Sequence, residues 1–170
     1  MPRRFPQDPI NQQPAPLTRR LAAMLYDGMI CIALLIVVAG VYTMIHQALI
    51  DTGLLAFDRY ADIMEREEIG HDPILFIVLF GSVWWFFGYF WRRNGQTLGM
   101  QVWLIRVQND DGTAISWSQA FMRMLLGLLS WATLGLGYLW VLWSRNGQAW
   151  TDRWSDSVTV RVPKPVKKRD

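Results

Sequence analysis

Three stretches of the chain carry no charged side chain over about one bilayer thickness: residues 28–50, 73–91 and 124–143. Apolar runs of roughly 20 residues predict membrane-spanning helices, so the first two each predict one full span. The third run is interrupted by Gly127, Gly135 and Gly137 and by a polar break at Ser130 to Thr133. Because glycine weakens a helix interior, we predict two half-helices there that enter the membrane and return. One ordinary span is the alternative that the length of the run allows.

Short alternating segments lie on either side of the third run. Residues 102–107, VWLIRV, precede the turn NDDG and the segment TAI, a pattern typical of a β-hairpin, and SVTVRV at 157–162 alternates in the same way. A lone hairpin is marginally stable, so a third strand is expected to join it. Such pairing would bring both ends of the third run to one side of the bilayer. The predicted fold class is an all-α membrane protein with two full transmembrane helices, a broken or re-entrant third segment and a small β cap.

Composition separates the tails from the membrane domain. The first residues are rich in proline and glutamine, which is typical of disorder, and the last are basic. The apolar run after Arg19 and Arg20 is longer than the core of a signal peptide and has no convincing cleavage site, so it is expected to remain as an anchor. The predicted parts are a disordered tail at 1–16, a membrane domain at 17–162 with apolar segments at about 21–50, 73–91 and 121–143, and a basic tail at 163–170.

Charge predicts the orientation. Residues 1–20 carry four arginines and one aspartate, whereas residues 51–72 carry seven acidic side chains and two arginines. The positive-inside rule therefore puts the N-terminus in the cytoplasm. Residues 144–170 carry seven basic side chains and three aspartates. The C-terminal part and the β cap are thus also expected on the cytoplasmic side, which fits a returning third segment.

Three separated motifs resemble the RDD family of bacterial membrane proteins: RRLAAMLYDGMI at 19–30, GQTLGMQVWLIRV at 95–107 and QAWTDRWSDSVTVRV at 148–162. By position, the arginine of the family corresponds to Arg20 and its two aspartates to Asp27 and Asp152. Arg153 stands where the family tends to have a basic residue. Met100 replaces a commonly basic residue and Asp156 a commonly small one. The resemblance implies a multi-pass protein of the bacterial inner membrane, and a transport role without an agreed ligand has been suggested for such regions.

Asp27 is the most unusual position, because it is an acid in a membrane-length apolar helix, seven residues after Arg20. A charge at such a position must be paired or hydrated. Arg20 leans away from Asp27 along the helix, so Arg123, at the start of the third run, is the stronger candidate partner. The predicted functional cluster is Arg20, Asp27, Arg123, Asp152 and Arg153. It would serve as a structural ion pair that docks helices or as a proton or ion relay, unless Asp27 is simply hydrated at the headgroup level.

The chemistry that the sequence lacks narrows the function. Cys31 is the only cysteine, and no nucleophile with a base, phosphate loop or metal-ligand spacing is present, so no enzyme activity, metal or cofactor is expected. The basic tail fits anionic inner-leaflet lipid better than nucleic acid. Two functions are left open. The first is a transport or permeation component, which needs a homo-oligomer or a membrane partner to enclose a pathway. The second is a non-catalytic scaffold or partner subunit in which the cluster is structural.

Overall fold

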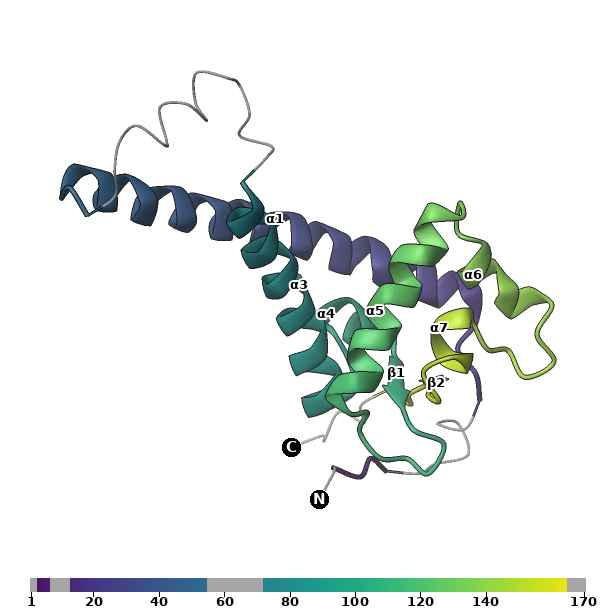
Figure 1. Cartoon of the computed structure of the whole chain (residues 1–170). Helices are drawn as coiled ribbons and strands as arrows, with labels where there is room; N and C mark the ends of the chain where they lie inside the picture. Colours follow the sequence, from purple (N-terminus) through teal and green to yellow (C-terminus); the bar gives the residue numbers. More distant parts are fainter. Residues whose placement is uncertain (1–2, 7–12, 55–71, 165–170) are drawn as a thin grey trace. The chain divides into compact units, whose positions relative to one another are not determined.

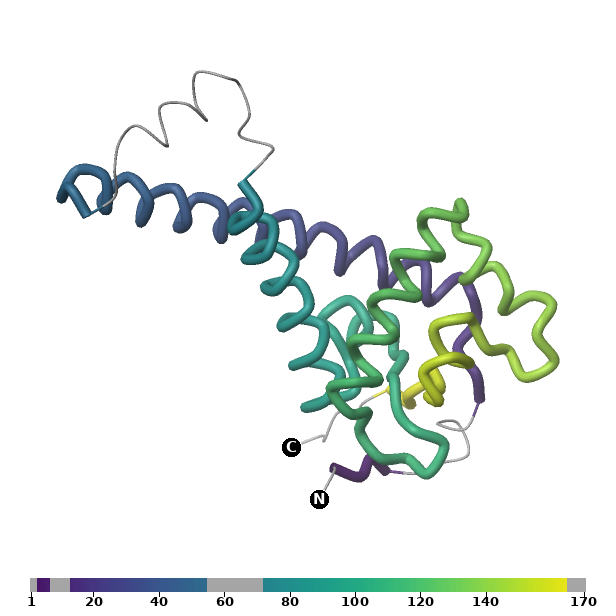
Figure 2. Tube along the Cα trace, in the orientation of Figure 1, coloured from purple at the N-terminus to yellow at the C-terminus, as the bar shows by residue number. Residues whose placement is uncertain are grey.

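The computed structural model describes residues 3–6, 13–54 and 72–164. They fall into two compact units. One combines Met1–Met29 with Trp84–Asp170 and contains the sheet and the short helices, and the other is Ile30–Val83. Figure 1 shows the elements and Figure 2 the path of the chain. The acidic connection predicted between the first two spans lies largely outside the described residues.

Two helices are long and apolar enough to cross a membrane: α1, Leu17–Asp51, and α3, Pro73–Asn94. At about 1.5 Å per residue, α1 is roughly 50 Å long and α3 roughly 33 Å, against a hydrocarbon core of about 30 Å. Asp72 caps α3, because its Oδ1 accepts from Ile74 N at 2.9 Å and its Oδ2 accepts from the Tyr42 hydroxyl at 2.6 Å. The two predicted spans are confirmed, and α1 begins eleven residues before the charge-free run that starts at Gly28.

The third apolar segment is broken, as predicted. It consists of α5, Trp117–Ala132, then α6, Leu136–Leu139, and the 3-10 turn η3, Trp140–Leu142. The two arms meet at an angle of 106°, and the chain reverses visibly at this bend (Figures 1 and 2). Leu134 and Gly135 adopt left-handed backbone conformations with φ of 56° and 85°, and the glycine N–H returns to Ser130 O at 2.7 Å. Gly135 is therefore a helix-ending residue.

Two antiparallel strands form the sheet, β1, Ile105–Gln108, and β2, Val158–Arg161, with Gln108 opposite Val158. Since β1 precedes α5 and β2 follows α7, the chain leaves the sheet and comes back to it. The hairpin partner predicted for VWLIRV is wrong, because β1 pairs with β2 and not with TAI. Asp111 accepts from both the N–H and the hydroxyl of Thr113, the first residue of TAI. These two bonds close a tight loop, so the TAI segment does not align with β1.

Two pieces of the N-terminal region lie along these strands and loops. Phe5 N donates to Gly112 O at 2.9 Å, and Ala15 N donates to Thr159 O at 2.8 Å. Phe5 and Ala15 are both buried. Strand edges offer unpaired N–H and C=O groups, which a proline-containing segment can partly satisfy. The disordered tail expected at 1–16 stays a prediction. Of the basic tail, only Pro163 and Lys164 lie within the described residues.

The short helices are fixed by local caps. Thr97 caps α4, Leu98–Val102, and Ser116 forms a reciprocal capping box with Gln119 at the start of α5. Helix α7, Trp150–Arg153, follows the loop after η3. Met100 packs against both buried apolar clusters of this unit. One cluster contains Trp91, Val107, Ile115 and Ala120, and the other contains Ala15, Ala23 and Ile105.

Candidate functional site

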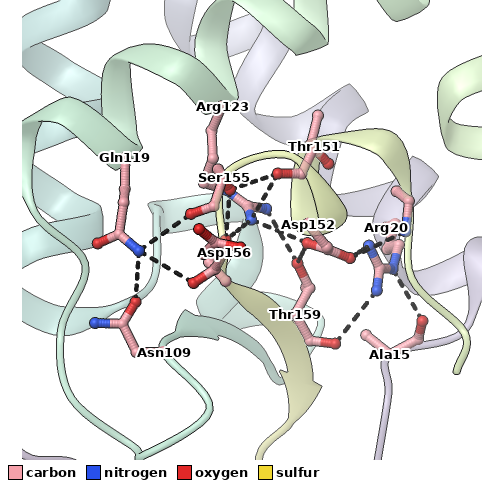
Figure 3. A network of polar contacts seen from close by, with 12 residues as sticks. Ala15, Arg20, Asn109, Gln119, Arg123, Thr151, Asp152, Ser155, Asp156 and Thr159 are labelled. Atoms are coloured by element: carbon pink, nitrogen blue, oxygen red, sulfur yellow. Dashed lines mark hydrogen bonds and ion pairs between the residues drawn. The ribbon is translucent and has the colours of Figure 1, made fainter.

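Asp152 is the centre of a buried polar network (Figure 3). Its Oδ1 accepts from Arg123 Nη1 at 2.9 Å and from Thr159 Oγ1 at 2.7 Å. Its Oδ2 accepts from Arg20 Nη1 and from the backbone N–H of Ala149 at 3.2 Å. Each carboxylate oxygen therefore has two donors, and the residue is 0% exposed. The two salt bridges found within the described residues both belong to Asp152.

Arg20 connects the first turn of α1 to strand β2 and to the loop before α7. Its Nε donates to Ala15 O at 2.9 Å, and its Nη2 donates to Gly147 O and Thr159 O, both at 3.3 Å. One guanidinium thus holds the entry to α1, the loop before α7 and strand β2. Only 4% of Arg20 is exposed, so these contacts replace water as its hydrogen-bond partners.

Arg123 makes the equivalent connection from α5. Its Nη1 donates to Ser157 Oγ, its Nη2 donates to Thr159 Oγ1 at 3.1 Å, and its Cζ lies 5.5 Å from the ring centroid of Trp91. The contact with the indole joins α5 to α3, while the hydroxyls join it to β2. Arg123 is 5% exposed, and its Nε is the one guanidinium nitrogen here without a hydrogen-bond partner among the described residues.

The electrostatics of this network favour an ionised Asp152. Burial alone would raise its pKa, but Arg20 and Arg123 and the Thr159 hydroxyl lower the pKa to about 2. Burying two cations around one anion is costly unless hydrogen bonds satisfy the charges. Here four donors satisfy the carboxylate. Removal of the anion would therefore leave two buried cations without a counterion, whereas removal of one cation would leave a single matched ion pair.

Asp27 lies in a separate contact. Its Oδ1 accepts from Gly99 N at 2.9 Å, and its Oδ2 accepts from Thr97 Oγ1. A Cβ atom added at Gly99 would lie 2.9 Å from Asp27 Cγ and even closer to Ala23 O. The glycine therefore allows α4 to pack directly on α1. The predicted partner Arg123 is wrong, because Arg123 is held by Asp152, and the partners of Asp27 are neutral donors from the GQTLG turn.

A comparison with protein families agrees with the resemblance of the three sequence motifs. The model of the RDD family matches residues 14–156, which is most of the chain. The protein belongs to the RDD family. The match includes Arg20, Asp27, Asp152 and Arg153 and ends before Thr159. No curated protein and no solved structure matches the chain. The RDD protein is thus a membrane protein by family and by its apolar helices.

Of the five residues in the predicted cluster, the structure brings three together. Arg20, Arg123 and Asp152 are in direct contact, whereas Asp27 binds α4. Arg153 is exposed on α7 although it adjoins Asp152 in sequence. Successive residues of a helix point in directions about 100° apart, so a buried Asp152 turns Arg153 outward.

The sequence did not identify the hydroxyls of the RDD protein that complete both contacts: Thr159 on β2, Ser157 directly before β2, and Thr97 before α4. The alternation of SVTVRV was a signal for the first two, because residues two apart share a strand face. Thr97 follows Gly95, the residue directly after α3, and a threonine in such a position is typical of the N-cap of the next helix. Asp156, whose role the sequence left open, adopts φ of 48° in the turn before β2, a conformation that aspartate tolerates better than most residues.

A cavity of about 170 Å³ opens beside the network. Arg20 and Asp152 form part of its wall, together with Gln108, Asp110 and Asn146. The two charged network residues already use their polar atoms on the protein. No group of three or more potential metal ligands occurs within the described parts of the chain.

Proposed function

We propose that this RDD protein is a non-catalytic membrane scaffold or partner subunit, in which the network around Asp152 holds α1 and α5 onto the sheet. The observation that carries the proposal is the closure of that network. Both oxygens of Asp152 bind protein donors, and the residue has no exposed surface. A carboxylate that relays protons or ions needs access to water or to an exchanging partner. A closed ion pair serves to hold structural elements in place.

The contact of Asp27 supports the same reading. Its two oxygens bind the N–H of Gly99 and the hydroxyl of Thr97, and the residue is 3% exposed. No charged side chain occurs between Gly28 and Ile50 on the same helix. Asp27 is therefore suited to fastening α4 to α1.

We further propose that the β1–β2 sheet and both ends of the domain lie on the cytoplasmic side of a bacterial inner membrane. The excess of arginine in residues 1–20 and the acidic segment at 51–72 support this orientation. The pairing of β1 with β2 supports a third segment that returns to the side from which it started. As a scaffold, the protein would work with a second copy or with another membrane protein.

A transport or permeation component is the second candidate, and the cavity beside Arg20 and Asp152 favours it. Its volume of about 170 Å³ would hold a small polar solute, and Asp110 and Asn146 add polar groups to its wall. In this case an assembly of several copies would be needed, because two spans do not enclose a pathway.

Reconstituted proteoliposomes distinguish the two candidates. The scaffold predicts no proton or sodium flux above protein-free vesicles, and it predicts that Asp27→Asn lowers thermal stability in detergent together with recovery of any co-purifying membrane protein. Thr43→Ala, on the exposed part of α1, is the matched control and should change neither. A protein-dependent flux that Asp27→Asn abolishes at unchanged thermal stability would reject the scaffold and favour transport.

A further inference from the structure

An aromatic and arginine surface at the C-terminal end of α3 is separate from the Asp152 network. Its residues are Trp85, Tyr89, Arg92, Arg93 and Trp117. Gly88 leaves room for this surface to form, because a Cβ atom at that position would collide with the ring of Trp117. The indole of Trp117 occupies this slot and stacks on Trp85, with ring centroids 5.5 Å apart and planes at 26°.

Arg92 lies over the ring of Trp117. Its Cζ is 4.8 Å from the ring centroid of Trp117, and the side chain is exposed. Arg92 forms neither a hydrogen bond nor a salt bridge with another residue of the described chain. A guanidinium stacked on an aromatic ring keeps its N–H donors free around its edge, in the fork that matches a phosphate.

Arg93 adds a second exposed cation. Its Nη1 donates to the Tyr89 hydroxyl at 2.7 Å, and its Cζ lies 5.6 Å from the ring centroid of Tyr89. This contact holds the guanidinium along the helix and leaves other N–H groups available. Arg92 and Arg93 therefore present two oriented positive charges without an acidic partner among the described residues.

The position of these residues along α3 identifies the ligand. Arg92 and Arg93 are in the last turn of a membrane-length helix, where the bilayer surface is expected. Trp85 precedes Arg92 by two turns, roughly 10 Å by helical rise, and is 58% exposed. A cation at the surface and an exposed indole below it match the phosphate and the upper acyl chain of one phospholipid.

We infer that this surface is a binding site for an anionic phospholipid, with the lipid phosphate on Arg92 and Arg93 and the upper acyl chain against Trp85. The site lies in the membrane domain, whereas the sequence pointed to the basic tail as the contact with anionic lipid. It does not depend on the proposed function, since a scaffold and a transport component would both need to be held in the leaflet.

Native mass spectrometry of the full chain in detergent tests the inference, with phosphatidylglycerol and phosphatidylcholine of equal chain length added in turn. The wild-type protein should retain phosphatidylglycerol preferentially. Arg92→Gln should weaken its binding about fivefold, the effect of one cation near an anionic surface. Arg92→Lys should weaken it less, because it keeps the charge and loses the stacked fork. Arg145→Gln removes an exposed arginine elsewhere and should leave binding unchanged.

Three results would overturn the site. The first is equal phosphatidylglycerol retention by wild type and Arg92→Gln, and the second is an equal loss in Arg145→Gln, which would indicate a general charge effect. The third is displacement of the lipid by glycerol phosphate at equal concentration, which would indicate a phosphate site without lipid contact. In the first case, loss of a co-purifying protein from Arg92→Gln would assign the surface to a protein partner instead. Circular dichroism of each variant verifies folding, and Arg93→Gln provides an independent variant with the same expected loss.

Discussion

Helix α1 passes through two environments, and its two parts differ in which side chains they bury. The first part, Leu17–Met29, belongs to the unit with the sheet and contains every buried residue of the helix: Arg20, Ala23 and Asp27. These positions are three and four residues apart and form one stripe. In the second part, from Ile30 onward, no residue is buried, and Ile36 is 68% exposed. The helix thus buries charged residues in its first part and exposes apolar residues in its second, the reverse of a helix in a water-soluble protein.

This difference shows where the surrounding solvent changes along a single helix. Near the sheet, protein acceptors replace water around Arg20 and protein donors replace water around Asp27, so specific partners determine which residues are tolerated. Beyond Ile30 no side chain is buried, as expected for a helix in lipid, where apolar character is the main requirement; the Tyr42 hydroxyl, which donates to Asp72, is an exception. Substitutions in the first part should therefore depend on individual contacts, and those at the apolar positions of the second part should depend mainly on hydrophobicity.

The largest effect is expected for Asp152→Asn. The substitution leaves Arg20 and Arg123 buried without an anion, which should cost about 3–5 kcal/mol in the free energy of unfolding. Denaturation in mixed micelles with sodium dodecyl sulfate measures this change. Asp156→Asn is the control, because Asp156 is exposed four residues away and asparagine tolerates the same backbone conformation. A similar loss in both variants would show that the network contributes little.

The next effect is expected for Gly99→Ala. Its Cβ would meet the backbone oxygen of Ala23 and the Asp27 carboxylate, and a backbone atom cannot move aside without shifting α4 from α1. We expect a loss of about 1–3 kcal/mol in the free energy of unfolding, as for an overpacked core. Gly28→Ala, next to Asp27 on α1, is the matched control, since a Cβ there meets nothing within 4 Å. It should be neutral or stabilising, because alanine favours a helix. Equal melting temperatures for Gly99→Ala and wild type would contradict the close packing.

Acid should loosen the first part of α1 and leave the second part helical. The pKa of Asp152 is about 2 in the folded protein against an ordinary value of 3.8. Its contribution to stability is therefore complete above pH 3.8 and is lost as the pH falls through 2, with an amplitude of about 2 kcal/mol. Unfolding by denaturant at pH 5 and at pH 2.5 measures the loss. Asp152→Asn should remove most of this dependence, and Asp110→Asn, an exposed acid on the same unit, should retain it. A wild-type stability that is constant over this range would contradict the ionised network.

Much of the fold could be predicted from the sequence, because lipid imposes a simple rule on long helices. Uninterrupted apolar runs located α1 and α3, and the glycines and the polar break of the third segment predicted that it bends. The alternation at 157–162 also predicted that this segment joins the strand at 102–107, and the pairing of β2 with β1 confirms it, although the TAI partner was wrong. The partners of Asp27 could not be predicted in the same way.

The site could be predicted in part. Arg123 was identified because charges next to membrane segments are costly and need partners, whereas Arg20 and Asp152 were identified from their positions in the motifs that resemble the RDD family. Their pairing was predicted wrongly for Asp27, since neutral donors carry no charge by which to recognise them. Thr97 and Gly99 satisfy that carboxylate with a hydroxyl and a backbone N–H, and almost every sequence offers such groups.

The smallest effect is expected for Ala33→Leu, in the second part of α1. Ala33 is exposed, so a larger apolar side chain would extend into lipid and contact no protein group that must move. The free energy of unfolding in micelles should change by no more than about 0.5 kcal/mol, the usual range for a surface position. Ala23→Leu makes the same exchange at a position that is 1% exposed beside Gly99 and should cost about 1–3 kcal/mol. Equal costs at the two positions would mean that close protein packing extends along α1 to Ala33, and the contrast between the two parts of α1 would then have to begin further along the helix.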